Sequence, residues 1–208
     1  MSDEPSKFRG SGLSAGARTR SGILDHAVDV ASAEGLEGLT IGRLAKDLSM
    51  SKSGLFGHFG SKEELQLATI ETARDVFIAK IIQPTIEVEA GLVRLKAMMS
   101  HWVAYVESRV FRGGCFFAAA SAEFDGRPGP VRDQIAMLTK AWVDALEEET
   151  REAQRRDELP TELEPRQLVF ELHAYVQEAN WAHQLLDDPQ AFDLARRAID
   201  GRLDRAAS

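Results

Sequence analysis

The stretch TIGRLAKDLSMSKSGLFGHF, from Thr40 to Phe59, carries the pattern of two short helices joined by a tight turn. Thr40 and Ser51 each stand directly before a helical run, where a hydroxyl oxygen can accept a hydrogen bond from an unpaired backbone N–H group. Leu55 and Phe59 lie four residues apart and give the second helix one buried side. Most of its other residues are small or polar, so the rest of this helix is predicted to face away from the core.

Helical patterns continue on both sides of this stretch. Apolar residues recur at helical spacing over residues 18–34, and Gly35 can end that helix in the left-handed conformation. Downstream, Ser61 and Glu64 form a capping box for a long helix that runs toward Pro84. No segment alternates with the two-residue period of a strand, so the chain is predicted to be all-α, with about nine helices. The helices expected after Pro84 span residues 91–109, 115–124, 131–156, 166–186 and 189–203.

The composition bounds the class of protein. The chain has 208 residues, of which 44% are hydrophobic, enough for one sizeable core or for a small domain joined to a larger one. Cys115 is the only cysteine, which excludes an intramolecular disulfide and fits a reducing, cytoplasmic location. No apolar run approaches the ~20 residues that span a bilayer, so no membrane association is expected. Residues 1–16 are polar and rich in Gly and Ser, and they are expected to form a disordered arm rather than a secretory signal.

The charge is unevenly distributed along the chain. The formal net charge is −8, but residues 1–62 carry a net charge of +1 and residues 63–208 carry −9. The local field, rather than the total charge, governs the approach of a nucleic acid. The acidic total therefore does not exclude nucleic-acid binding by the first part of the chain.

The order of these elements resembles the N-terminal domain of the tetracycline-repressor (TetR) family of transcription regulators. A later segment, Gly113 to Arg132, resembles a C-terminal segment of one branch of that family. The resemblance implies a three-helix, helix-turn-helix DNA-binding domain over residues 17–64, whose third helix docks in the major groove, and a helical ligand-binding and dimerisation domain over residues 65–208. The residues that carry the N-terminal resemblance are Thr40-Ile41-Gly42-Arg43-Leu44-Ala45, Ser51-Lys52-Ser53-Gly54-Leu55-Phe56, His58-Phe59 and Ser61-Lys62-Glu63.

The DNA-binding residues follow from this match and from the chemistry of the helix. Lys52 can reach a guanine edge or a phosphate, and Ser51 and Ser53 can donate to phosphate at the helix N-terminus. The family usually has Tyr, which binds a phosphate, where this chain has Phe56, and Gly57 offers no side chain to the bases. Affinity is therefore expected to depend on phosphate contacts and DNA shape, with Lys7 and Arg9 of the arm as further candidates. The predicted DNA-binding residues are Arg18, Arg20, Thr40, Arg43, Ser51, Lys52, Ser53, Gly57, His58 and Lys62.

In the C-terminal half, polar residues interrupt otherwise apolar helices. Such a mixture is typical of a small-molecule pocket between helices, although most of the aromatic residues would equally fit an ordinary core. The resemblance implies an effector site here, and the lining suggests an apolar or aromatic ligand with one polar group. The predicted ligand-binding residues are His101, Trp102, Tyr105, Phe116, Phe117, Glu123, Trp142, Phe170, His173 and Gln177.

A two-fold operator requires two recognition helices about one DNA turn, ~34 Å, apart, so a homodimer is expected. The last two helices, over residues 166–186 and 189–203, are candidates to pair with their counterparts in a four-helix bundle. The same residues would also suit an intrachain core. Those that could line the bundle are Val169, Phe170, His173, Val176, Gln177, Trp181 and Gln184.

Other functions are less well supported by the sequence. The histidines show no metal-ligand spacing, so neither a metal nor a cofactor is expected. Cys115 lies in an apolar run that favours an inert thiol, and no other group assembles into a catalytic site, so the chain is not expected to be an enzyme. A protein-binding helical adaptor that has lost DNA binding stays open because of Phe56 and Gly57. The favoured hypothesis is a homodimeric repressor that a small molecule releases from its operator by moving the long helix after Ser61.

Overall fold

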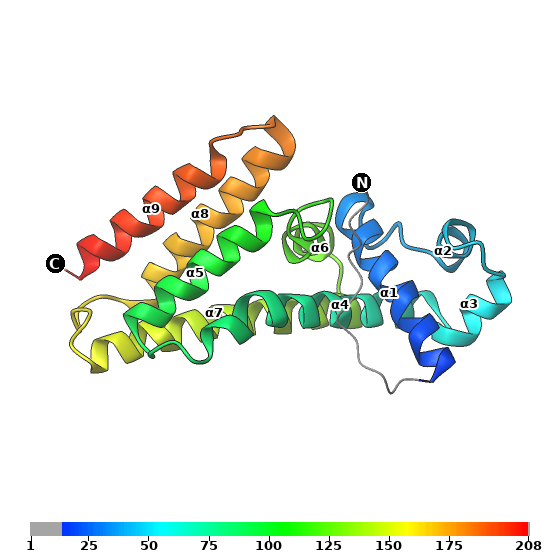
Figure 1. Ribbon diagram of the computed structural model, residues 1–208, viewed down its shortest axis with the longest axis horizontal. Helices are drawn as coiled ribbons and strands as arrows, with labels where there is room; N and C mark the ends of the chain where they lie inside the picture. The colour runs from blue at the N-terminus through cyan, green and yellow to red at the C-terminus, as the bar shows by residue number, and fades with distance from the viewer. Residues whose placement is uncertain (1–13, 208) are drawn as a thin grey trace, which may run out of the picture.

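The computed structural model describes residues 14–207, and these form nine α-helices without a β-strand. The predicted arm over residues 1–16 lies almost entirely outside this range, as do Lys7 and Arg9. The helices, drawn in Figure 1, are α1 (Ala15–Glu34), α2 (Ile41–Asp47), α3 (Lys52–Phe59), α4 (Lys62–Phe77), α5 (Leu92–Glu107), α6 (Phe116–Phe124), α7 (Pro130–Arg155), α8 (Pro165–Leu186) and α9 (Ala191–Ala206).

The first helix begins three residues earlier than expected. The Ser14 hydroxyl oxygen accepts a hydrogen bond from the backbone N–H of Ala17 and caps the helix before Ala15. Residues 15 and 16, which were expected to belong to the arm, are therefore helical. The predicted stop at Gly35 is confirmed, since α1 ends at Glu34. Gly35 has a φ of 88°, which is unfavourable for a residue with a Cβ atom.

The helix-turn-helix stretch forms as its caps and apolar spacing predict. Thr40 caps α2 and Ser51 caps α3. Ser49, in the turn between them, has a φ of 54°, an uncommon conformation for a residue other than glycine. Leu44 and Leu55 are fully buried in the hydrophobic core, and α3 packs against α2 and α4. Figure 1 shows these helices at one end of the molecule, with α8 and α9 at the other.

Helix α4 packs against α1 among the first helices and runs into the C-terminal part, where it packs against α7. After Phe77 its backbone widens into a π-helical turn over Ile78–Ile82 and then tightens into a 3₁₀ turn over Gln83–Thr85, where Pro84 removes a backbone donor. π-Helical turns are rare and often mark functional positions. This one adjoins the aromatic centre of the C-terminal core.

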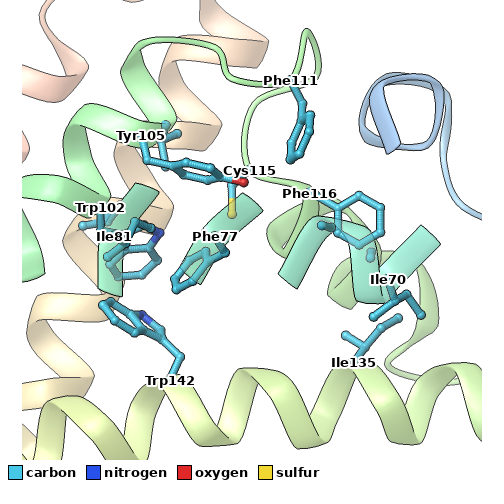
Figure 2. Packing of buried hydrophobic residues seen from close by; sticks show 14 of the residues in the cluster. Ile70, Phe77, Ile81, Trp102, Tyr105, Phe111, Cys115, Phe116, Ile135 and Trp142 are labelled. Carbon is cyan, nitrogen blue, oxygen red and sulfur yellow. The ribbon is translucent and has the colours of Figure 1, made fainter. Parts of the chain in front are cut away.

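The C-terminal core is built around aromatic rings. Figure 2 shows the rings of Trp102, Tyr105 and Trp142 around that of Phe77, with the thiol of Cys115 beside them. The Phe77 ring makes edge-on contacts with Trp142 at a centroid distance of 5.0 Å and with Tyr105 at 5.7 Å. Such edge-to-face pairs stabilise a core beyond the area that they bury.

Candidate DNA-binding face and ligand cavity

The exposed side of α3 is small and polar. Leu55 and Phe59 point into the core, whereas Lys52, Ser53 and Gly57 are exposed. The Ser51 hydroxyl oxygen accepts from the backbone N–H of Gly54 at 3.0 Å, which leaves the N-terminal end of α3 ordered and open to solvent. This arrangement suits an approach to phosphate by backbone and hydroxyl groups.

Acidic side chains surround two of the basic residues predicted to bind DNA. The Arg43 guanidinium group donates to Glu34 at 2.6 Å and to Asp47 at 2.7 Å, and it lowers the pKa of both carboxyl groups. Lys62 donates to Glu37 at 2.6 Å and lowers the pKa of that carboxyl group. A DNA phosphate would therefore have to replace a carboxylate at each cation.

The other predicted DNA-binding residues lie on α1, directly before α2 and on α3. Thr40 uses its hydroxyl oxygen to accept from the Arg43 backbone N–H at 3.1 Å. The Arg20 guanidinium group lies over the Phe59 ring, 5.0 Å from its centroid, and so ties α1 to α3. Arg18 is exposed near the start of α1, and His58 is half-buried near the end of α3. Phe56 is 54% exposed on the surface of α3.

Glu123 on α6 joins the C-terminal part to the first helices. Its carboxylate accepts from the backbone N–H groups of Leu36 at 2.7 Å and Glu37 at 3.0 Å, in the loop between α1 and α2. A second contact adjoins it, because the loop before α6 lies so close to α1 that a Cβ atom on Gly113 would be 2.0 Å from the Ser32 carbonyl oxygen. The predicted role of Glu123 in ligand binding is not supported by this position, since the residue does not line the cavity described next.

A cavity of about 330 Å³ lies among α4, α5, α6, α7 and α8. Most of its wall is apolar and aromatic, and the edge-on pair of Trp102 and Trp142 forms part of it, with ring centroids 5.4 Å apart. The lining residues are Arg74, Phe77, Ile78, Ile82, Trp102, Cys115, Phe117, Ser121, Leu138, Thr139, Ala141, Trp142, Ala145, His173 and Gln177.

The titratable groups that line the cavity are either neutral or already paired with an opposite charge. Burial lowers the pKa of His173 and raises that of the Cys115 thiol, so both favour their neutral forms. Arg74 is charged, but it pairs with Asp75 at 2.8 Å and with Glu71. The residues from 14 to 207 contain no cluster of metal-ligating side chains.

Two family models match the chain. Residues 23–69 match the model described as bacterial regulatory proteins, tetR family, and residues 91–199 match the model described as tetracyclin repressor-like, C-terminal domain. The second match alone covers more than half of the 208 residues. The chain belongs to the TetR family. It is therefore a ligand-responsive, DNA-binding transcription regulator, and the predicted family and all-α fold class are confirmed.

Solved structures of TetR regulators share the fold. A regulator from Chloroflexus aurantiacus J-10-FL superposes with a TM-score of 0.80 at 19% identity, covering 91% of this chain and 94% of that one. SCO4454 from Streptomyces coelicolor gives 0.77 at 22% identity, covering 93% and 91%. AibR in complex with isovaleryl coenzyme A and operator DNA gives 0.70 at 23% identity, covering 90% and 97%. A comparison with curated protein sequences finds no match.

Five of the ten residues predicted to bind the TetR-family effector line the cavity. The other five do not, for reasons that their surroundings show. Tyr105 and Phe116 are buried in the adjoining core, and His101 is half-buried elsewhere on α5. Phe170 is 70% exposed on α8, and Glu123 binds the α1–α2 loop. The five lining residues are Trp102, Phe117, Trp142, His173 and Gln177.

The sequence interpretation missed the wall that α4 supplies and, apart from Trp142, the wall that α7 supplies. Phe77 and Ile78 come from the end of α4, and Leu138 and Thr139 come from α7. Their spacing in the sequence is that of any buried helical face. Only the break of α4 near Pro84, where the helix departs from its regular form, gave a local signal.

None of the helices that the structure describes is long and apolar enough to cross a membrane.

Proposed function

We propose that this TetR-family chain is a homodimeric repressor that binds a palindromic operator through α3 and releases it when a small molecule occupies the cavity. The observation that carries the proposal is the course of α4. Its first residue, Lys62, follows α3 directly, and Arg74 and Phe77 near its other end line the cavity. A ligand that shifts the end of α4 would thus change the position of α3. Ligand and operator affinities would then be reciprocally coupled.

At the operator, Ser51, Lys52 and Ser53 supply the contacts to phosphate and base edges. No ion pair involving Lys52 is seen among residues 14–207, whereas Arg43 and Lys62 begin with carboxylate partners. Lys52 can therefore bind DNA without first breaking an ion pair with a carboxylate. Arg43 and Lys62 act as secondary phosphate contacts that must exchange partners. The DNA target assigns the activity to the cytoplasm.

Exposed apolar side chains of α8 and α9 support the homodimer. Val169 and Val176 on α8 are buried within this chain, so they serve the intrachain core. Several large apolar side chains of the two helices remain exposed, and a second copy that buried them would remove this apolar area from water. The exposed residues and their exposed fractions are Phe170 (70%), Trp181 (48%), Leu185 (64%), Leu186 (60%) and Leu194 (50%).

Glu123 supplies a second link between the cavity and the DNA-binding helices. Phe117 and Ser121 of α6 line the cavity, and Glu123 on the same helix holds the backbone N–H groups of the α1–α2 loop. That loop also accepts a hydrogen bond at the Leu36 carbonyl oxygen from Gln66 on α4, at 2.9 Å. A ligand that displaces α6 would therefore act on the same loop that α4 contacts.

The test is a selection of genomic DNA fragments by the purified full-length chain, followed by gel shifts at several salt concentrations. We expect one palindromic sequence to be enriched. Lys52→Ala should weaken its binding about ten-fold or more, because a base or phosphate contact is lost. Lys140→Ala, which removes the same charge from the surface of α7, should leave the affinity unchanged. Failure to enrich any DNA would reject the repressor and favour the protein-binding adaptor, for which the exposed Phe56 is the supporting observation.

A further inference from the structure

We infer that the cavity takes a small, uncharged aromatic compound whose carbonyl or comparable acceptor receives a hydrogen bond from the Trp142 indole N–H group. This inference rests on the proposed role of the cavity as the effector site, and it specifies the chemical class of the effector.

Unpartnered polar atoms define the position of the acceptor. Trp142 is 8% exposed, and its Nε1 atom has no hydrogen-bond partner among the described residues, nor does the buried hydroxyl of Thr139. The two residues lie three positions apart on α7 and therefore share one side of that helix. Trp102 is 2% exposed, and its Nε1 atom also has no hydrogen-bond partner among the described residues.

Buried donors without partners are rare, because their lost hydration is not replaced. Trp142 and Thr139 both line the cavity, so a ligand that brings an acceptor within reach of their buried polar atoms would supply the missing partner. A pure hydrocarbon would fill the space but leave the indole N–H groups unpaired. The pattern therefore favours a ligand with an oxygen or nitrogen acceptor on an otherwise apolar body.

The charges around the cavity favour a neutral ligand. The titratable groups that line it are Arg74, Cys115 and His173, and the last two favour their neutral forms. Arg74 already pairs with Glu71 and Asp75. A carboxylate would enter without an unpaired cation to meet it, and an ammonium group would find no unpaired carboxylate among the lining residues. Burial of either charge is unfavourable under these conditions.

The size and walls of the cavity favour a ring system. Its volume of about 330 Å³ is near the lower end of the ~300–1,000 Å³ of small-molecule pockets. The Trp142 ring makes edge-on contacts with the rings of Phe77 and Trp102 (Figure 2), and the three rings offer both faces and edges to an aromatic guest. One or two fused rings with a single acceptor group match this shape and polarity.

Three compounds with the same ring system test the inference by titration calorimetry on the full-length protein at pH 7.5. They are 2-acetylnaphthalene, which carries a neutral acceptor, 2-ethylnaphthalene, which lacks one, and the anion 2-naphthoate. We expect the ketone to bind about ten-fold tighter than the hydrocarbon, as one recovered hydrogen bond predicts, and the anion to bind weakest. Tightest binding by the anion would overturn the inference, as would the absence of binding by all three compounds.

Variants assign the preference to the indole N–H group. In Trp142→Phe the ratio of ketone to hydrocarbon affinity should fall to about one, because the donor is lost while an aromatic ring remains. Thr139→Val is a second, nearly isosteric change at the cavity, and it should also reduce the ratio. It keeps the inference testable if Trp142→Phe does not fold. The matched control is Thr150→Val on the same helix. Its hydroxyl already donates to the Leu146 carbonyl oxygen at 2.9 Å, and the residue does not line the cavity.

An unchanged ratio in both Trp142→Phe and Thr139→Val would overturn the inference. Gel shifts with the selected DNA fragment on the same preparations separate its failure from that of the proposed function. DNA binding without any preference for the ketone would reject the chemical class alone. The ketone preference without DNA binding would support the cavity chemistry and reject the repressor alone.

Discussion

Arg43 and Lys62 lie at the DNA-facing end of the molecule with carboxylates already bound to them, whereas the Trp142 N–H group and the Thr139 hydroxyl, in the cavity near the other end of α4, have no partner among residues 14–207. The two regions differ in solvent access as well. Arg43 and Lys62 are about 40% exposed at their side chains, but the cavity atoms are buried.

This contrast indicates how each region binds. Exposed ion pairs are worth little, ~0–1 kcal/mol, because water and salt compete with them, so a phosphate can replace a carboxylate at small cost. A buried donor cannot turn to water, and its pairing depends on the arrival of a ligand. DNA binding should therefore be graded and sensitive to salt, whereas cavity binding should be selective for the polarity of the ligand.

The largest difference in stability should follow from removing a phenyl ring from each of the two regions. Phe77→Ala should lower the free energy of unfolding by about 3–5 kcal/mol, because it deletes a ring from the centre of the aromatic core. Phe56→Ala removes a ring that is 54% exposed on α3 and should change stability by less than about 0.5 kcal/mol. Urea denaturation of both variants measures this, and equal losses would contradict the assignment of the two rings.

The fold followed from the sequence because its signals are local. The caps at Thr40, Ser51 and Ser61 each require only the three residues that follow, and the structure has all three bonds. Helical spacing then identified the buried side of α3. The one-turn extension of α1 was missed because Ser14 lies in a Gly- and Ser-rich segment that has no apolar pattern.

The site was less predictable because its contacts are distant in sequence. Glu123 binds backbone N–H groups 86 and 87 positions away, and a carboxylate in an apolar helix gives no indication of such partners. Phe170 and Val169 are neighbours on α8, yet one is 70% exposed and the other is buried. A helix that is apolar on more than one side does not reveal which side its own chain covers.

A second prediction concerns the Glu123 link. Glu123→Gln replaces a carboxylate that two backbone N–H groups share, so we expect a stability loss of roughly 1–3 kcal/mol and a change in DNA affinity. Glu164 makes the same two-fold contact, to the backbone N–H groups of Arg166 and Gln167 at the start of α8. Glu164→Gln should also destabilise the chain, yet leave DNA affinity unchanged. Equal effects of both changes on DNA affinity would remove Glu123 from the coupling.

A smaller change tests the ion pairs at the DNA face. Glu37→Gln removes the acid that holds Lys62, so DNA binding at low salt should tighten roughly two- to five-fold, and the dependence of affinity on salt should steepen. Glu148→Gln is the matched control, because Glu148 pairs with Arg155 at 2.7 Å on α7, outside the DNA-binding helices. Weaker binding by Glu37→Gln would contradict this. It would show that the Glu37–Lys62 pair stabilises the DNA-binding face and does not compete with DNA for Lys62.

The smallest effect is expected from the pH dependence of His173. Burial lowers its pKa in the folded state below the ordinary value of 6.5, so the unfolded chain takes up the proton first as the pH falls. The neutral form therefore contributes stability that is present above pH 6.5 and is lost as the pH falls toward the lowered pKa. Urea denaturation at pH 7.5 and 5.5 should show a smaller acid-induced loss in His173→Gln than in the unmodified chain. An identical loss in both would place His173 in a hydrated position.

The most direct test of the link between cavity and DNA-binding face is the operator Kd measured with and without a saturating neutral ligand of the cavity. Calorimetry first establishes that the ligand is bound. The account predicts that the ligand weakens operator binding by about 5- to 150-fold, that the operator weakens ligand binding by the same factor, and that Glu123→Gln reduces both effects. A ligand that occupies the cavity fully and leaves the operator Kd unchanged would contradict it.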